Sequence, residues 1–173
     1  PYAWAMPRRE LFAGKPYFKL SCVETGRGCP LRCNFCSIAA ATGSTYQRLG
    51  VPGEEDLVGV HFCATCDGPF YSGAEEVVVI GGGNSALEEG LHLSEFARRV
   101  RVLARSGLSA SPVLQERVRS DPQFAIRTGV DIVELEGDQG RFAAVLARDR
   151  DSGEILRFPA AAAFVFIGLK PND

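Results

Sequence analysis

Two cysteines, Cys63 and Cys66, are separated by two residues, and Asp67 follows directly. At this spacing the thiolate of one cysteine can resolve a mixed disulfide that the other has formed. Asp67 is placed to exchange a proton with a thiol. A Cys-x-x-Cys pair can also be half of a structural zinc site, so the spacing alone leaves both interpretations open.

A glycine-rich turn follows the thiol pair as Gly81-x-Gly83-x-x-Ala86. It comes after the apolar run 77–80 and opens a segment with helical spacing, which is the context that a dinucleotide-binding turn requires. Gly81 permits the tight turn, Gly83 lets the backbone approach a pyrophosphate, and the small Ala86 allows close packing of helix on strand. The helix N-terminus would offer free N–H groups to phosphate. Together, the two motifs indicate electron transfer from a nicotinamide to a disulfide.

Three further cysteines, Cys29, Cys33 and Cys36, share one glycine-containing loop. Three thiolates can hold three irons of a [4Fe-4S] cluster and leave the fourth iron open for a substrate or cofactor. A zinc site formed by these cysteines, with Cys22 as a fourth ligand, is an alternative. A loop without metal is the third interpretation.

The pattern of apolar residues predicts the elements that position these motifs. The run 77–80 is rich in β-branched residues, as expected for a buried strand. The predicted strands are 17–23, 77–80, 100–103, 129–135, 141–149, 154–159 and 161–167, and the predicted helices are 85–96 and 111–120. Turn-forming residues separate the strands between 129 and 159, which favours an antiparallel meander. The predicted fold class is α/β, a three-layer Rossmann-like dinucleotide-binding domain with an antiparallel β-meander.

The composition restricts the class of protein. The chain has 173 residues, of which 46% are hydrophobic, so it is expected to form one domain, or one domain and a fragment. The net charge of −2 gives no basis for binding nucleic acid or an anionic membrane. No apolar run approaches the roughly 20 residues that span a bilayer, and the N-terminus lacks the apolar core of a signal peptide. A reducing cytoplasm is therefore expected, where cysteines serve catalysis or metal binding. His61 and His92 have no partners at metal-ligand spacing, which favours surface or core roles.

Residues 1–40 resemble the radical S-adenosylmethionine enzymes through Cys29-x-x-x-Cys33-x-x-Cys36, with Phe35 just before the third cysteine. The surrounding Glu-Thr-Gly-Arg-Gly-Cys-Pro is similar to the subgroup that also carries a cobalamin-binding domain. The resemblance implies a [4Fe-4S] cluster on the three cysteines. The barrel strands of that family do not fit into the sequence that follows. Residues 1–40 are therefore expected to be a poorly packed fragment and not an independent domain.

Residues 41–173 resemble the low-molecular-weight thioredoxin reductases. The resemblance rests on Ala-Thr-Gly-Ser at 41–44, Cys-Ala-Thr-Cys-Asp-Gly at 63–68, the glycine turn with Glu88 and Glu89, and Phe-Ile-Gly-Leu-Lys-Pro-Asn at 166–172. It implies that Cys63 and Cys66 form the redox-active disulfide and that Asp67 is the acid/base residue. It also implies reduction by a flavin and thioredoxin, or a similar dithiol protein, as the partner. The change of resemblance near residue 40 indicates a join between two unrelated coding sequences.

The same resemblance implies an NADPH site. Its residues would be Gly81, Gly82, Gly83, Asn84, Ser85, Ala86, Glu89, Arg105 and Gly168. In the family a His-Arg-Arg run and a further arginine bind the 2′-phosphate, whereas here only Arg105 remains. No acidic residue that would favour NADH replaces the others, so NADPH is expected, with weak discrimination against NADH. The flavin domain's own Gly-x-Gly-x-x-Gly is not found in these residues. FAD is therefore expected from a flavin domain supplied in trans, and a homodimer is one assembly that the resemblance allows.

Three functions follow from these observations. The first is an NADPH-dependent disulfide oxidoreductase domain, inactive without a flavin domain. The second is a module that binds NADP(H) without turnover. The third is an iron–sulfur or radical enzyme remnant carried by residues 1–40. Flavin colour would distinguish the first from the second, and a brown chromophore would support the third.

Overall fold

A computed structural model describes residues 44–171. Its strands are β1 (Ser44–Tyr46), β2 (Val60–His61), β3 (Val77–Ile80), β4 (Val100–Ala104), β5 (Phe124–Thr128), β6 (Val130–Asp138), β7 (Arg141–Asp149), β8 (Ile155–Pro159), β9 (Ala163–Val165) and β10 (Leu169–Pro171). Its helices are α2 (Ala64–Asp67), the 3₁₀ turn η2 (Gly68–Tyr71), α3 (Asn84–Leu93) and α4 (Pro112–Ser120). The predicted strand 17–23, the segment 1–40 and its three-cysteine loop lie outside the described residues.

A parallel five-stranded sheet in the order β2-β9-β3-β4-β5 forms the centre of the domain. All four residues of β3 are buried, and successive side chains point to opposite faces of the sheet. Val77 and Val79 pack in one apolar cluster, whereas Val78 and Ile80 pack in the other. A strand buried on both faces needs a continuous apolar run, which is why the pattern predicted β3 correctly.

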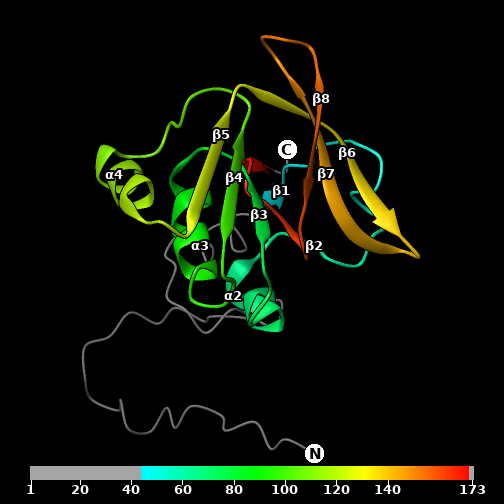
Figure 1. Cartoon of the computed structure of the whole chain (residues 1–173), viewed down its shortest axis with the longest axis horizontal. Coiled ribbons are helices and arrows are strands. Elements are labelled where there is room, and N and C mark those ends of the chain that lie inside the picture. Colours follow the sequence, from blue (N-terminus) through cyan, green and yellow to red (C-terminus); the bar gives the residue numbers. More distant parts are fainter. Residues whose placement is uncertain (1–43, 172–173) are drawn as a thin grey trace, which may run out of the picture.

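Each face of the parallel sheet is covered by a different layer. Helices α3 and α4 lie on one side and the antiparallel meander β6-β7-β8 lies on the other (Figure 1). Helix α3 buries Ala86, Leu87, Gly90 and Leu93 against the sheet. The meander contributes Leu135, Val145 and other apolar residues to the opposite cluster. The three-layer α/β fold class predicted from the sequence is therefore confirmed.

The observed elements differ from the predicted ones mainly at their ends. Helix α3 ends at Leu93, three residues earlier than predicted, and the final core strand is limited to Ala163–Val165. Strands β1, β2, β5 and β10 and the short helices α2 and η2 were not predicted. Strand β5 is an edge strand whose residues are only half-buried or exposed, so it lacks the apolar run that identified β3.

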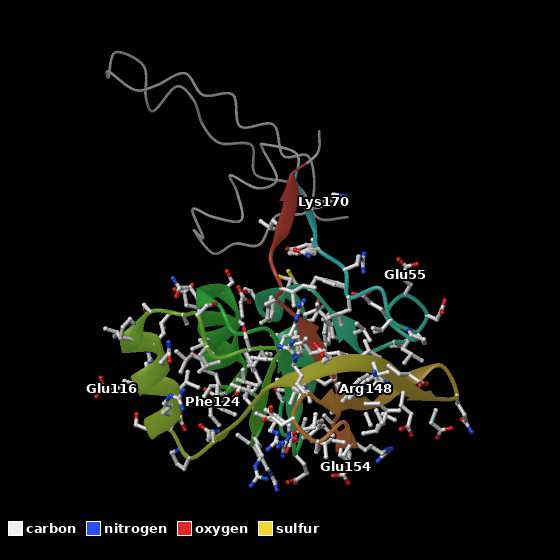
Figure 2. All side chains as sticks on the ribbon, turned by 90° about the horizontal axis from the view of Figure 1, so that it is seen from above. Glu55, Glu116, Phe124, Arg148, Glu154 and Lys170 are labelled. Carbon is white, nitrogen blue, oxygen red and sulfur yellow. The ribbon has the colours of Figure 1, made fainter. Side chains whose placement is uncertain are left out.

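A separate two-stranded ribbon pairs β1 with β10 in antiparallel register. Figure 2 shows this ribbon, with Lys170 labelled, projecting away from the sheet and the meander. It brings the first and last described residues together, because Ser44 lies opposite Pro171. No helix in this described part of the chain is long and apolar enough to cross a membrane.

Candidate functional site

The glycine turn begins at the carboxyl end of β3. Gly81 has φ +142°, a backbone conformation that side chains strongly disfavour. A Cβ atom at this position would lie 3.0 Å from the carbonyl carbon of Phe166 and closer still to its oxygen. Gly83 has φ −86° and would have only the Ser109 hydroxyl near its Cβ, at 3.8 Å. Gly81 is therefore required by the fold, whereas Gly83 leaves open space above the turn.

A cleft of about 610 Å³ lies at the carboxyl ends of β3, β4 and β9. Open α/β sheets bind ligands at this edge. Seven of the predicted nucleotide-binding residues line it, namely Gly81, Gly82, Gly83, Asn84, Ser85, Arg105 and Gly168. Ala86 is fully buried beneath the turn, with its Cβ 3.1 Å from the position that a Cβ on Gly81 would take. This placement fits the predicted close packing of helix on strand.

Backbone and side-chain hydrogen bonds fix the shape of the cleft. The Gly81 N–H donates to the Leu103 carbonyl at 2.9 Å, and the Gly82 carbonyl accepts from Ser109 N–H at 2.8 Å. The Asn84 side-chain oxygen accepts from the Ser111 N–H at 2.7 Å. These bonds tie the loop after β4 to the glycine turn, so the two walls of the cleft are joined.

The N-terminus of α3 opens into the cleft. Gly83 is its N-cap residue, and no side chain caps the first turn. The first N–H groups of a helix have no partner within the helix, and the helix dipole makes this end attractive to anions. The start of α3 therefore offers a favourable environment for an anion such as phosphate.

The thiol pair lies at the N-terminus of the short helix α2. Cys63 is the N-cap residue, and its Sγ accepts a hydrogen bond from the Cys66 N–H at 3.3 Å. Both cysteines are free thiols, with Cys63 half-buried and Cys66 exposed. Burial raises the pKa of the Cys63 thiol to about 12, and the Cys66 side chain and the Glu89 carboxylate add to this rise. Cys66 is therefore the sulfur that external reagents reach first.

Glu89 connects the two motifs. It lies on α3, and its Oε2 accepts a hydrogen bond from the Ala64 N–H at 3.1 Å. Burial raises the pKa of this carboxyl group, which opposes its ionisation. Glu89 was expected at the nucleotide site, but its described hydrogen bond is with the thiol helix and it does not line the cleft. One helix thus begins at the nucleotide turn and supports the start of α2.

Asp67 belongs to a hydrogen-bonded chain of three side chains. His61 Nδ1 lies 3.2 Å from Asp67 Oδ2, and His61 Nε2 lies 2.6 Å from the Tyr71 hydroxyl. Burial lowers the pKa of His61, although the Asp67 carboxylate acts in the opposite direction. A neutral imidazole can donate from Nδ1 to the carboxylate while Nε2 accepts from the tyrosine hydroxyl. This arrangement links Asp67, which follows Cys66 in the chain, to His61 and Tyr71.

This contact of His61 was not predicted. His61 was expected to have a surface or core role without metal partners, and no group of three or more metal-ligating side chains is found among residues 44–171. The contact with Asp67 was hidden because β2 has only two residues and shows no readable pattern. In the sequence, only the spacing of His61, Asp67 and Tyr71 could have indicated that these side chains are in contact.

The two thiols should differ strongly in reactivity. In the reduced chain at pH 8, a thiol with a pKa near 12 is ionised in only about one molecule in ten thousand, and the thiolate is the nucleophile. We expect iodoacetamide to modify Cys66 well before Cys63, and Cys63 alkylation to rise about tenfold per pH unit. Peptide mapping by mass spectrometry at short times measures both rates, and equal rates at pH 8 would contradict the burial of Cys63.

The same pKa predicts a trend in stability. The folded chain holds the Cys63 proton more tightly than the unfolded chain does. The contribution of the protonated Cys63 thiol to the free energy of unfolding is therefore fully present below the ordinary thiol pKa. It is lost as the pH rises toward 12.

The model of the family described as pyridine nucleotide-disulphide oxidoreductase matches residues 11–173. The chain belongs to this family, and its relatives show that it is thioredoxin reductase-like. It is 36% identical over 138 residues to the thioredoxin reductase of Bacillus subtilis, covering 78% of this chain and 43% of that protein. It is 38% identical over 143 residues to the NADPH-dependent thioredoxin reductase 3 of Arabidopsis thaliana, covering 79% of this chain and 27% of that protein.

Solved structures agree with the sequence relatives. The Lactococcus lactis thioredoxin reductase matches with a TM-score of 0.71 and 32% identity, over 75% of this chain and 44% of that one. The chain thus spans less than half the length of the first curated relatives that it matches. The family match also includes Cys29, Cys33 and Cys36, and it gives no support to the radical S-adenosylmethionine resemblance or to a [4Fe-4S] cluster.

Proposed function

We propose that this chain carries the nucleotide site and the redox-active disulfide of an NADPH-dependent, flavin-containing disulfide oxidoreductase. Thioredoxin or a similar dithiol protein would receive the electrons. The observation that supports this most is the path of α3, which begins at the phosphate-binding turn and supports the thiol helix through Glu89. One rigid element thus connects the two sites that such a reaction requires.

The described residues fit a nicotinamide dinucleotide. The cleft offers a glycine turn without side chains, uncapped N–H groups at the start of α3, and Arg105 at the end of β4. These are the groups that bind a pyrophosphate and a ribose phosphate. The name of the Arabidopsis relative also describes that protein as NADPH-dependent.

The thiol chemistry can be assigned to this chain's own residues. Reduction of the Cys63–Cys66 disulfide takes two electrons and two protons and yields two thiols. A bound flavin would supply the electron pair, because it accepts hydride from a nicotinamide and can pass electrons to sulfur. Asp67 would deliver a proton to a leaving thiolate and recover it through His61. The reduced pair would then reduce a partner disulfide by exchange, with exposed Cys66 as the first sulfur reached.

A chimeric protein tests the proposal. Residues 44–171 would replace the corresponding segment of the Bacillus subtilis thioredoxin reductase, which supplies the flavin domain. We expect the chimera to reduce thioredoxin with NADPH, and we expect the Cys63→Ser and Cys66→Ser versions to lose this activity while still binding NADPH. A chimera that holds flavin and binds NADPH but reduces nothing would favour the alternative of a binding module without turnover.

A further inference from the structure

Arg150 lies in the turn between β7 and β8, and this turn is firmly attached to the central sheet. The Arg150 N–H donates to the Gly129 carbonyl at 2.9 Å, at the junction of β5 and β6. Asp149 accepts from the N–H groups of Asp151 and Ser152 at 2.9 and 3.0 Å and pairs with Arg127 of β5. These bonds fix the backbone of the turn next to the carboxyl end of the sheet.

The side chain of Arg150 extends to the end of β4. Its Nη1 donates to the Arg105 carbonyl at 3.3 Å, and its Nε lies 3.4 Å from Asp131 Oδ2. Arg105 Nε lies 3.7 Å from the other oxygen of the same carboxylate. Two guanidinium groups therefore share one carboxylate, and both remain open to solvent, with 46% of the Arg150 side chain and 79% of the Arg105 side chain exposed.

This cluster lies where a dinucleotide places its adenosine ribose. Arg105 and Asp131 line the cleft, whereas Arg150 lies outside its lining and contacts both of these residues. The end of the second strand of such a domain faces the ribose 2′ position. Two arginines and one aspartate carry a net positive charge. The planar guanidinium matches phosphate oxygens in pairs and is suited to a dianion. Arg48 also lines the cleft, but its described contact is with the Phe62 ring, 4.2 Å from the guanidinium carbon, and not with this cluster.

We propose that Arg150 is a second cation for the 2′-phosphate of NADPH and acts together with Arg105. This inference rests on the proposed nucleotide function. Asp131 pairs with both guanidinium groups in the absence of the nucleotide and competes with the phosphate for them. Because each Asp131 oxygen already faces an arginine, the carboxylate is poorly placed to accept a hydrogen bond from the 2′-hydroxyl of NADH.

The proposal changes the specificity expected from the sequence. One charge-assisted contact from Arg105 gives a preference for NADPH of about tenfold. A second contact from Arg150 raises the expected preference to on the order of a hundredfold. Arg150 lies 45 residues after Arg105 in the sequence, so no local motif reveals it.

Titration of the full chain with NADPH and with NADH tests the proposal, using variants Arg150→Gln, Asp131→Asn and Arg157→Gln. Arg150→Gln should weaken NADPH binding about tenfold and change NADH binding by less than about twofold. Asp131→Asn should strengthen NADPH binding, because it removes the competing carboxylate, and should leave NADH unchanged. Arg157→Gln is the matched control and should change neither affinity, since Arg157 pairs with Glu136, which does not line the cleft, whereas Arg150 pairs with Asp131, which does.

The outcomes separate the two claims. If the unaltered chain binds neither nucleotide, the proposed function fails and the inference fails with it. If it binds both but Arg150→Gln has no effect, or weakens both equally, only the role of Arg150 is wrong. If Asp131→Asn weakens NADH binding, Asp131 accepts a hydrogen bond from the ribose 2′-hydroxyl. The role proposed for Asp131 is then wrong. Thermal unfolding of each variant shows whether the turn has stayed folded.

Discussion

Gly81→Ala should destabilise the domain and abolish nucleotide binding together. An alanine here must adopt φ near +142°, which is nearly restricted to glycine, and its Cβ would collide with the Phe166 carbonyl group. The Phe166 backbone cannot move freely, because its N–H donates to the Ile80 carbonyl at 2.8 Å. We expect the free energy of unfolding to fall by roughly 3 kcal/mol or more, as measured by denaturant titration.

Gly83 provides the matched comparison. Its φ of −86° suits any residue and its Cβ site is open, so Gly83→Ala and Gly83→Val should leave the free energy of unfolding within about 1 kcal/mol. Gly83→Val should nevertheless weaken NADPH binding at least about a hundredfold, because the side chain fills the space that the pyrophosphate occupies. Equal instability of the Gly81 and Gly83 variants would contradict the distinct roles assigned to the two glycines.

The fold was predictable where local sequence determines it. Strand β3 is buried on both faces and is therefore a continuous run of β-branched residues. The glycine turn that follows it matches the pattern of a dinucleotide-binding turn. The meander was recognisable because turn residues separate alternating segments. Strand β5 was missed because its place at the sheet edge leaves it partly solvated. Strand β2 was missed because two residues are too few to show the alternation of apolar and polar residues that identifies a strand. Its pairing with β9 nevertheless positions His61.

The site was predictable in its motifs and not in its connections. Cys63, Cys66 and the glycine turn were proposed as site residues from their spacing, their sequence context and the resemblance to the thioredoxin reductases. Three contacts join residues that are distant in the sequence, namely Glu89 with Ala64, His61 with Tyr71, and Arg150 with Arg105. Such contacts depend on how strands and turns are placed in space, which spacing along the chain does not encode. They relocated Glu89 and added His61 and Arg150 as functional candidates.

The Cys63–Cys66 disulfide of the isolated chain should resist NADPH, even though we expect the nucleotide to bind to the same domain. A disulfide is a poor direct acceptor of hydride, and the flavin ring normally divides the transfer into two steps. Dithiols act by thiol exchange, which needs no hydride acceptor, so dithiothreitol should reduce the pair readily. Reduction by NADPH should therefore require the flavin domain of the chimera, with the difference in rate exceeding about a thousandfold, or ~4 kcal/mol in activation free energy.

Anaerobic thiol counting tests this account most directly. The oxidised chain and the oxidised chimera would each be incubated with NADPH, alkylated and mapped by mass spectrometry, with Cys63→Ser as the control. Mapping separates Cys63 and Cys66 from Cys22, Cys29, Cys33 and Cys36. The account predicts two new thiols at Cys63 and Cys66 in the chimera and none in the chain alone. Two new thiols at these positions in the chain with NADPH alone would contradict it.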